Sequence, residues 1–254
     1  MNTPLFILQI SDCHLLEHPE ATLSGINTTQ SLQQVLKHAY EQHGKADLIL
    51  VTGDLAQEPC QSSYQRLFTA LQKYQTRSIC LPGNHDDLSL MQQYINSRTI
   101  NCNKHILFPH WQTICLNSKK TGSQGGYLAA NEFTFLTETL SRHPELNTLV
   151  AIHHHCIPTQ SLWMDSMIIE NNDELLNLLK QYPQVKAITG GHIHQELETQ
   201  SNNQLILGTP STCFQYKPLS TEYALDDKTP GYRVLYLYPE GEIKTHIYHL
   251  PENA

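Results

Sequence analysis

Five short motifs of this 254-residue chain carry side chains that bind metal ions in many proteins, and each motif follows an apolar run. They are Asp12-Cys13-His14, Gly53-Asp54, Gly83-Asn84-His85-Asp86, His153-His154-His155 and Gly191-His192-Ile193-His194. Carboxylates and imidazoles together suit transition metals such as Mn, Fe, Zn, Ni or Co, whereas a set of oxygen ligands alone would suit Mg or Ca. The asparagine adds a donor oxygen without adding charge. The motifs therefore predict a transition-metal centre.

Each motif taken alone also has an ordinary structural explanation. Asp-x-His after a strand occurs by chance, Gly-Asp is usually a turn or a helix cap, and Gly-Asn-His-Asp is compatible with a capped turn. The three consecutive histidines are compatible with a surface run. The most specific single motif is Gly191-His192-Ile193-His194, because it follows an apolar strand. The presence of all five motifs, each at the end of an apolar run, favours a shared metal centre over five separate explanations.

The elements expected to position these motifs alternate along the first half of the chain. Apolar runs predict strands over residues 5–10, 47–52 and 77–81, and helical spacing predicts helices over 28–43, 62–74 and 87–96. Continuous apolar strands separated by helices indicate βαβ units with buried, largely parallel strands. Ligands of α/β folds bind beyond the carboxyl ends of the strands. The topology therefore points the motifs to one place.

The second half of the chain contains more strands than helices. Strands are predicted over 111–116, 148–152, 185–189, 205–207, 232–238 and 243–250, and helices over 132–142 and 174–181. No linker, repeat or low-complexity stretch divides the chain. We therefore predict one α/β domain, residues 1–254, with two packed mixed β-sheets and helices outside them.

The composition argues against several classes of partner. The net charge is −8, which disfavours binding to DNA or RNA. No apolar run approaches the roughly 20 residues of a membrane helix, and the N-terminus lacks the basic region of a signal peptide. The seven scattered cysteines fit buried thiols in a reducing compartment. We expect a cytoplasmic protein without membrane or nucleic-acid partners, and the sequence leaves its oligomeric state open.

The order of the motifs is similar to that of the calcineurin-like metallophosphoesterases. The residues around the motifs resemble more closely the bacterial class III 3′,5′-cyclic AMP phosphodiesterases, over residues 8–12, 52–57, 81–86, 191–197 and 209–213. The resemblance spans nearly the whole chain. It implies the fold of that superfamily, a four-layer α/β/β/α sandwich, and two divalent or mixed-valence transition-metal ions, with Fe and Mn favoured over Zn, Co or Ni.

The resemblance also implies a set of ligands. The first metal is expected to bind Asp12, His14 and His194, the second Asn84, His154 and His192, and Asp54 is expected to bridge them. In the family a proline usually follows two residues after the histidine of the fourth motif, whereas this chain has Cys156 there. His153 and His155 therefore remain alternatives to His154.

The activity implied by the resemblance is hydrolysis of 3′,5′-cyclic AMP to 5′-AMP, with a hydroxide between the two metals as the nucleophile. His85 is expected to protonate the leaving group or stabilise the phosphoryl oxygens, and its alternative is a supporting hydrogen bond. The residues expected to contact the substrate are His14, Asn84, His85 and His194. Trp163 is a candidate for lining the nucleotide pocket and equally a candidate for covering a hydrophobic patch.

Two other functions stay open at this point. One is a metallophosphodiesterase of broader specificity, which acts on 2′,3′-cyclic nucleotides or glycerophosphodiesters. The other belongs to a different class, a metal-binding scaffold that has lost catalysis. The complete ligand set and the intact His85 argue against the scaffold.

Overall fold

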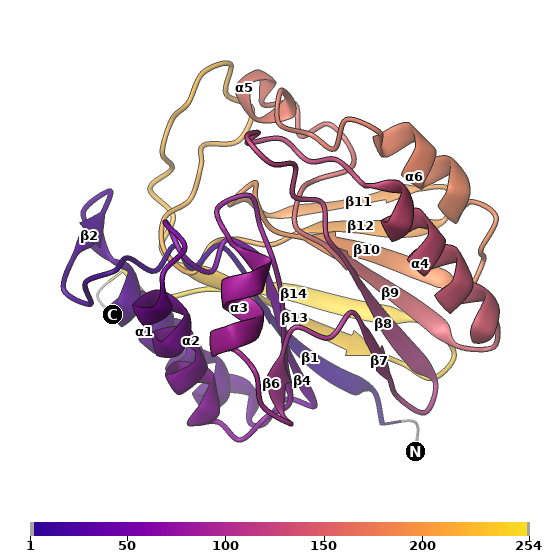
Figure 1. Ribbon diagram of the computed structural model, residues 1–254, viewed down its shortest axis with the longest axis horizontal. Coiled ribbons are helices and arrows are strands. Elements are labelled where there is room, and N and C mark those ends of the chain that lie inside the picture. The colour runs from indigo at the N-terminus through magenta and orange to yellow at the C-terminus, as the bar shows by residue number, and fades with distance from the viewer. Residues whose placement is uncertain (1–2, 253–254) are drawn as a thin grey trace.

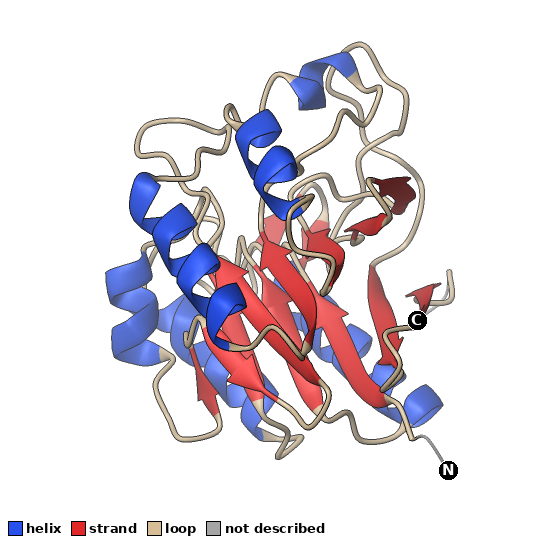
Figure 2. Cartoon of the chain, turned by 90° about the vertical axis from the view of Figure 1, so that its right-hand side faces the viewer, coloured by secondary structure: helices blue, strands red, loops and turns tan. Residues whose placement is uncertain are grey.

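Two six-stranded β-sheets pack face to face, and helices cover the outer surface of each sheet (Figure 1). The computed structural model describes residues 3–252 of the chain. A view turned by 90° shows helices both in front of and behind the strands (Figure 2). This architecture confirms the predicted fold class of two packed mixed sheets flanked by helices.

The first sheet combines four parallel strands with two antiparallel ones. Its order is β14 (Ile243–His249), β13 (Gly231–Leu237), β1 (Leu5–Ile10), β4 (Leu48–Thr52), β5 (Ser78–Leu81) and β6 (Ile100–Asn101). Strands β1, β4, β5 and β6 are parallel, whereas β13 is antiparallel to β1 and β14 to β13. The carboxyl ends of β1, β4 and β5 therefore lie at the same edge.

The second sheet also has four parallel strands at its centre. Its order is β11 (Leu197–Ser201), β12 (Gln204–Gly208), β10 (Val185–Gly190), β9 (Asn147–Ile152), β8 (Trp111–Leu116) and β7 (His105–Leu107). Strands β12, β10, β9 and β8 are parallel, and the edge strands β11 and β7 are antiparallel to their neighbours. The carboxyl ends of β9 and β10 are therefore adjacent.

The helices form the two outer layers. The first sheet is covered by α1 (Thr28–His43), α2 (Gln61–Gln72) and α3 (Leu88–Tyr94), and the second by α4 (Ala130–Arg142) and α6 (Asn172–Leu179). Helix α1 shows how the sequence specifies this packing, because its buried residues Leu32, Val35, Leu36 and Ala39 follow one helical face. The Asn27 side chain begins the helix by accepting the N–H of Gln30 at 2.9 Å.

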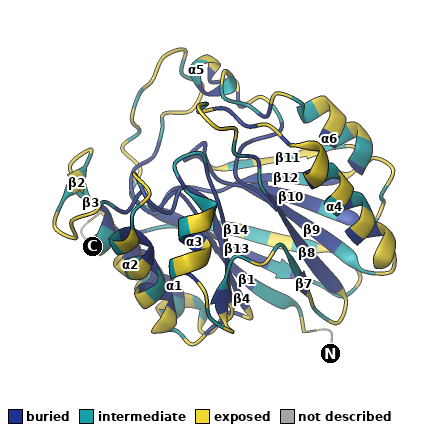
Figure 3. Ribbon diagram, in the orientation of Figure 1, coloured by how far each residue is buried: buried dark blue, intermediate teal, exposed yellow. Residues whose placement is uncertain are grey.

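Apolar side chains fill the space between the sheets as well as the space under the helices. Leu50 and Ile79 of the first sheet pack with Leu149 and Ala187 of the second, and all four are fully buried. Figure 3 shows buried strands beneath helices whose outer faces are exposed. Burial on both faces explains why the central strands read as continuous apolar runs rather than alternating ones.

The predicted strands and helices are present, and their ends lie within two residues of the predicted ones. The sequence did not indicate six short elements, which are β2 (Thr22–Leu23), β3 (Ile26–Asn27), β6, β7, β11 and α5 (Leu162–Asp165). Elements of two to five residues carry too few side chains to show a period.

The prediction of one domain over residues 1–254 stays a prediction, and residues 1–2 and 253–254 of that range lie outside the described residues. Within residues 3–252, no helix has the length and apolar character needed to cross a bilayer.

Candidate metal centre

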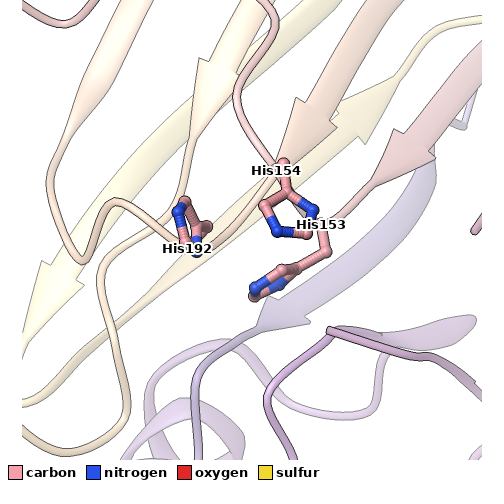
Figure 4. A group of neighbouring side chains, drawn as sticks. All are labelled: His153, His154 and His192. Carbon is pink, nitrogen blue, oxygen red and sulfur yellow. The ribbon is translucent and has the colours of Figure 1, made fainter. Parts of the chain in front are cut away.

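The five motifs converge at the carboxyl ends of the central strands of both sheets. Asp12, Asp54 and Asn84 follow β1, β4 and β5, and His153 and His192 follow β9 and β10. Four groups of three residues have ligand atoms within 4.8 Å of one another: Asp12, His14 and His194; His14, Asp54 and His85; Asp12, Asp54 and His153; and His153, His154 and His192. Figure 4 shows His153, His154 and His192 meeting at the ends of their strands.

The backbone turns sharply at these positions. Five residues have φ between 43° and 67°: Asp12, His14, Asp54, His192 and His194. Residues other than glycine rarely adopt this left-handed conformation, because their Cβ approaches the following carbonyl oxygen. The strain is held by hydrogen bonds, since both carboxylate oxygens of Asp12 accept the N–H of His192 at 3.0 Å. Asp54 Oδ1 likewise accepts the N–H of His85 at 2.9 Å.

Two glycines allow the loops to approach the carboxylates closely. A Cβ on Gly83 would clash with the carboxylate of Asp54, and a Cβ on Gly191 would clash with the hydroxyl of Ser11 and the carboxylate of Asp12. A residue with a side chain would therefore push the β5 or β10 loop away from the centre. These close approaches explain the glycines of the third and fifth motifs.

Four histidines of the motifs use the same ring nitrogen, Nδ1, to bond to an oxygen of the surrounding protein. The Nδ1 atoms donate to oxygen acceptors at 2.8–2.9 Å, namely His14 to Gln57 Oε1, His85 to the Gln57 carbonyl, His153 to the Thr52 carbonyl and His194 to the Phe214 carbonyl. Because a carbonyl oxygen only accepts, each ring carries its proton on Nδ1. The Nε2 atoms of His14, His153 and His194 face the carboxylates at 3.3–3.8 Å, and each can bind a metal ion when it carries no proton.

The first cluster consists of Asp12, His14 and His194. The Nε2 atoms of His14 and His194 lie 3.1 Å apart, and His194 Nε2 lies 3.4 Å from Asp12 Oδ1. Burial lowers the pKa of His14 to about 4, although the Asp54 carboxylate opposes this shift. Burial opposes ionisation of Asp12, but the attraction of His194 outweighs it and holds the Asp12 pKa below its usual value. A neutral imidazole beside an ionised carboxylate suits a divalent cation.

The second cluster is formed by Asp54, Asn84, His153 and His192. His153 Nε2 lies 3.3 Å from Asp54 Oδ2 and 3.1 Å from Asn84 Oδ1. Burial lowers the pKa of His153, but the attraction of Asp54 is stronger and raises it to about 9. His192 Nε2 is buried without a hydrogen-bond partner among the described residues. A buried nitrogen without a partner, next to the His153 ring that itself faces Asp54 and Asn84, fits a metal ligand.

The three consecutive histidines have three different environments. His153 faces Asp54 and Asn84, as described above. His154 uses both ring nitrogens, since Nδ1 lies 2.7 Å from Ser118 Oγ and Nε2 donates to the Gln124 carbonyl at 3.1 Å. His155 stacks on His192 with ring centroids 5.7 Å apart. His154 thus lies beside the centre with both nitrogens already partnered.

The centre opens to solvent on the side of the third motif. Asn84 and His85 are partly exposed, whereas Asp12, Asp54, His153 and His194 are buried. The His85 ring stands edge-on to His14, with centroids 5.0 Å apart. A molecule that enters from solvent therefore meets Asn84 and His85 first.

Two supporting residues have roles that the sequence did not indicate. Gln57 accepts from His14 through its side chain and from His85 through its carbonyl, so that one residue orients both rings. The buried Asp86 carboxylate accepts the N–H groups of Leu55, Ala56 and Gly83, and thereby ties the Asp54 loop to the Asn84 loop. A glutamine or an aspartate in a loop does not by its residue type indicate such a role.

The sequence profile of the calcineurin-like phosphoesterase family matches residues 6–196. Similar proteins include CpdA of Haemophilus influenzae, a 3′,5′-cyclic adenosine monophosphate phosphodiesterase, which is 38% identical over 95% of this chain and 88% of its own length. A 3′,5′-cyclic-nucleotide phosphodiesterase of Nostoc sp. is 38% identical over 98% of this chain and 93% of its own length. CpdA of Escherichia coli K12 is 36% identical, with coverages of 97% and 90%.

Solved structures with little sequence identity share the fold. A dimetal phosphatase from Danio rerio superposes with a TM-score of 0.62 at 14% identity, over 95% of this chain and 98% of the other. GAP50, the anchor in the inner membrane complex of Plasmodium, superposes with a TM-score of 0.64 at 12% identity, over 98% and 90%. At these identities the likeness concerns the architecture alone.

The hydrogen bond from Gln57 to His14 generates a first prediction. Gln57→Leu removes the side-chain acceptor, and metal affinity is expected to fall about 10- to 100-fold because the His14 ring loses its fixed tautomer and orientation. Gln57→Glu keeps an acceptor and is the matched control, and both variants keep the carbonyl that accepts from His85. A metal titration against a competing chelator measures the affinity. Equal affinities of the leucine variant and the unmodified protein would contradict the role of Gln57.

Proposed function

Because the chain belongs to the calcineurin-like phosphoesterase family, we propose that it is a metal-dependent phosphodiesterase that hydrolyses 3′,5′-cyclic AMP to 5′-AMP. The observation that supports this most is the pair of clusters on either side of Asp54, with Asn84 and His85 at their open side. The substrate class is supported by relatives that are 36–38% identical over nearly their full length and are cyclic-nucleotide phosphodiesterases.

The proposed ligands follow the two clusters. Asp12, His14 and His194 would hold one metal, Asn84, His153 and His192 would hold the other, and Asp54 would be shared between them. His153 takes the place of the expected His154, because its Nε2 faces Asp54 and Asn84 while both nitrogens of His154 have other partners. The mixture of nitrogen and oxygen donors fits Fe or Mn, which the family resemblance favours, and it also fits Zn, Co or Ni.

Two bound cations supply an activated water molecule and neutralise charge on the phosphoryl oxygens. His85 performs the proton transfer in this proposal. Its Nδ1–H stays bonded to the Gln57 carbonyl, so that only Nε2 is available to the substrate. The protonated ring donates its Nε2 proton to the departing 3′-oxygen and becomes the neutral Nδ1–H tautomer that the carbonyl already favours. His14, Asn84 and His194 complete the substrate contacts.

The proposed setting is the cytoplasm, with a small cyclic nucleotide as the partner. The structure has seven free cysteines, five of them buried, which is the pattern of a protein that works in a reducing compartment.

Turnover on a panel of diesters tests the proposed function. The metal-loaded protein is expected to cleave 3′,5′-cyclic AMP with a higher kcat/KM than 3′,5′-cyclic GMP, 2′,3′-cyclic AMP or an aryl phosphodiester, and to lose activity on chelation and regain it on metal add-back. Metal content is measured on the same samples. Preferred cleavage of 2′,3′-cyclic AMP or the aryl diester indicates the broader phosphodiesterase. No hydrolysis with any metal indicates the scaffold.

The choice between His153 and His154 is tested by metal content. His153→Ala is expected to reduce the metal from about two ions per chain to about one, because it removes a proposed ligand. His154→Ala is expected to keep about two, since that ring binds Ser118 and Gln124. Mass-spectrometric metal analysis after dialysis gives the stoichiometry. Loss of metal in His154→Ala, with full loading in His153→Ala, would restore His154 as the ligand.

The role of His85 is tested by separating turnover from metal binding. His85→Asn is expected to lower kcat on 3′,5′-cyclic AMP by at least about 100-fold while the metal content stays unchanged, because the ring serves proton transfer rather than metal binding. The matched control is His110→Asn, an exposed histidine at the amino end of β8 and thus at the far end of the sheet. A parallel loss of metal and turnover would instead make His85 a ligand.

A further inference from the structure

Three aromatic side chains form a cluster that the metal centre does not use. The rings of Trp163, Tyr216 and Tyr223 contact one another edge to face, with centroids 4.9–5.5 Å apart. They come from two segments, α5 and the loop after β12. Figure 1 shows these segments side by side, and the N–H of Ser220 donates to Ser161 Oγ at 3.3 Å. Two otherwise separate parts of the chain therefore build one aromatic surface.

This surface is continuous with the first metal cluster. The Tyr216 ring stacks on His194, with centroids 4.3 Å apart and an interplanar angle of 27°. Phe214 packs against the same His194 and stacks on His14 at 5.9 Å. From His194 outward, the rings run through the partly buried Tyr216 to Tyr223, which is 58% exposed. A ligand held at the metal centre can therefore reach the aromatic surface.

Exposed apolar side chains gather around the same two segments. Leu162, Leu219 and Leu225 are 67%, 69% and 43% exposed. With Tyr223 they are four of the six large hydrophobic residues that are exposed within residues 3–252. Figure 3 shows the loop beside α5 largely as exposed chain. Apolar side chains that gather in solvent beside a polar centre are typical of a ligand-binding surface.

We infer that Trp163, Tyr216 and Tyr223 form the binding wall for the base of the nucleotide, while the metal centre binds its phosphate. The inference rests on the proposed function. It adds a binding site for the base, which is the part of the substrate that the metal centre does not bind. A cyclic nucleotide joins a charged phosphodiester to a flat, apolar base through one ribose. The polar clusters around Asp54 match the first part, and the aromatic surface beside His194 matches the second.

The wall distinguishes diesters that carry a base from diesters that do not. Stacking of a base on an aromatic side chain is tolerant of base identity, because every base has a π-face. The wall therefore favours nucleotides over glycerophosphodiesters, and it leaves the choice between adenine and guanine to other contacts. Such a wall argues against glycerophosphodiesters as substrates, which are one part of the broader-specificity alternative.

The test compares two ligands that share a phosphate and a ribose but differ in the base. Dissociation constants of 5′-AMP and ribose 5-phosphate for the metal-loaded protein are measured by isothermal titration calorimetry. Tyr223→Ala is expected to weaken 5′-AMP about ten-fold, as for the loss of one stacking partner, and to change ribose 5-phosphate by less than about two-fold. Tyr223→Phe keeps the ring and is expected to retain 5′-AMP binding.

The matched control is Tyr238→Ala, because Tyr238 follows the end of β13, which runs antiparallel to β1 and thus ends far from the metal centre. Equal weakening of both ligands in Tyr223→Ala, or no weakening of either, would overturn the inference. A protein that cleaves no cyclic nucleotide would instead overturn the proposed function. The two failures are distinguishable because the ratio of the two dissociation constants is measured without any turnover of cyclic AMP.

Fluorescence gives a second readout that needs no catalysis. The chain has two tryptophans, and Trp111 begins β8 at the end of the sheet opposite the centre. A saturable change in tryptophan emission with 5′-AMP is therefore expected to come from Trp163 and to disappear in Trp163→Phe. Ribose 5-phosphate is expected to give little change. Persistence of the change in Trp163→Phe, or an equal change with ribose 5-phosphate, would overturn the inference.

Discussion

Two carboxylates with almost no access to water determine how this end of the molecule is built. Asp12 and Asp54 are 0% and 2% exposed, at the point where the strands of both sheets end. An isolated buried carboxylate would be protonated or would destabilise the fold. Here burial acts in that direction, but neighbouring histidines outweigh it and keep the pKa of both groups below the usual value. The backbone N–H groups and histidine rings around the two carboxylates compensate for these buried negative charges.

The compensation comes from both sheets. The N–H of His192, from the second sheet, donates to Asp12, and the ring of His153 faces Asp54. The N–H of His85, from the first sheet, donates to Asp54. Around these contacts, five motif residues have left-handed backbone, which costs of order 1–3 kcal/mol at each. Such backbone strain persists in a fold only where surrounding contacts hold it. Bound cations would add the remaining positive charge beside the two carboxylates.

The sequence predicted the fold and the location of the centre because both depend on local patterns. Apolar runs specified the central strands, and the motifs at their ends followed from parallel topology. The sequence left three adjacent histidines open, and strand geometry explains why. Leu149 and Ala151 of β9 face the other sheet, whereas Val150 and Ile152 face the helices. By alternation, position 153 continues the inner face and 154 the outer one. Which face is inner is decided only by tertiary packing.

The sequence did not predict the role of Gln57 or the presence of helix α5, although it made Trp163 of α5 a candidate for lining the nucleotide pocket. A glutamine that orients two rings looks like any polar loop residue, and a helix of four residues has no period to detect. Both lie away from the strand ends, where the proposed metal ligands lie. The division has a functional logic, since in the proposed function the side chains at the strand ends bind the phosphate, which all phosphodiesters share. Discrimination among diesters must therefore come from loops that reach past the phosphate, and α5 and the loop after β12 are the segments whose aromatic side chains extend from His194 in that direction.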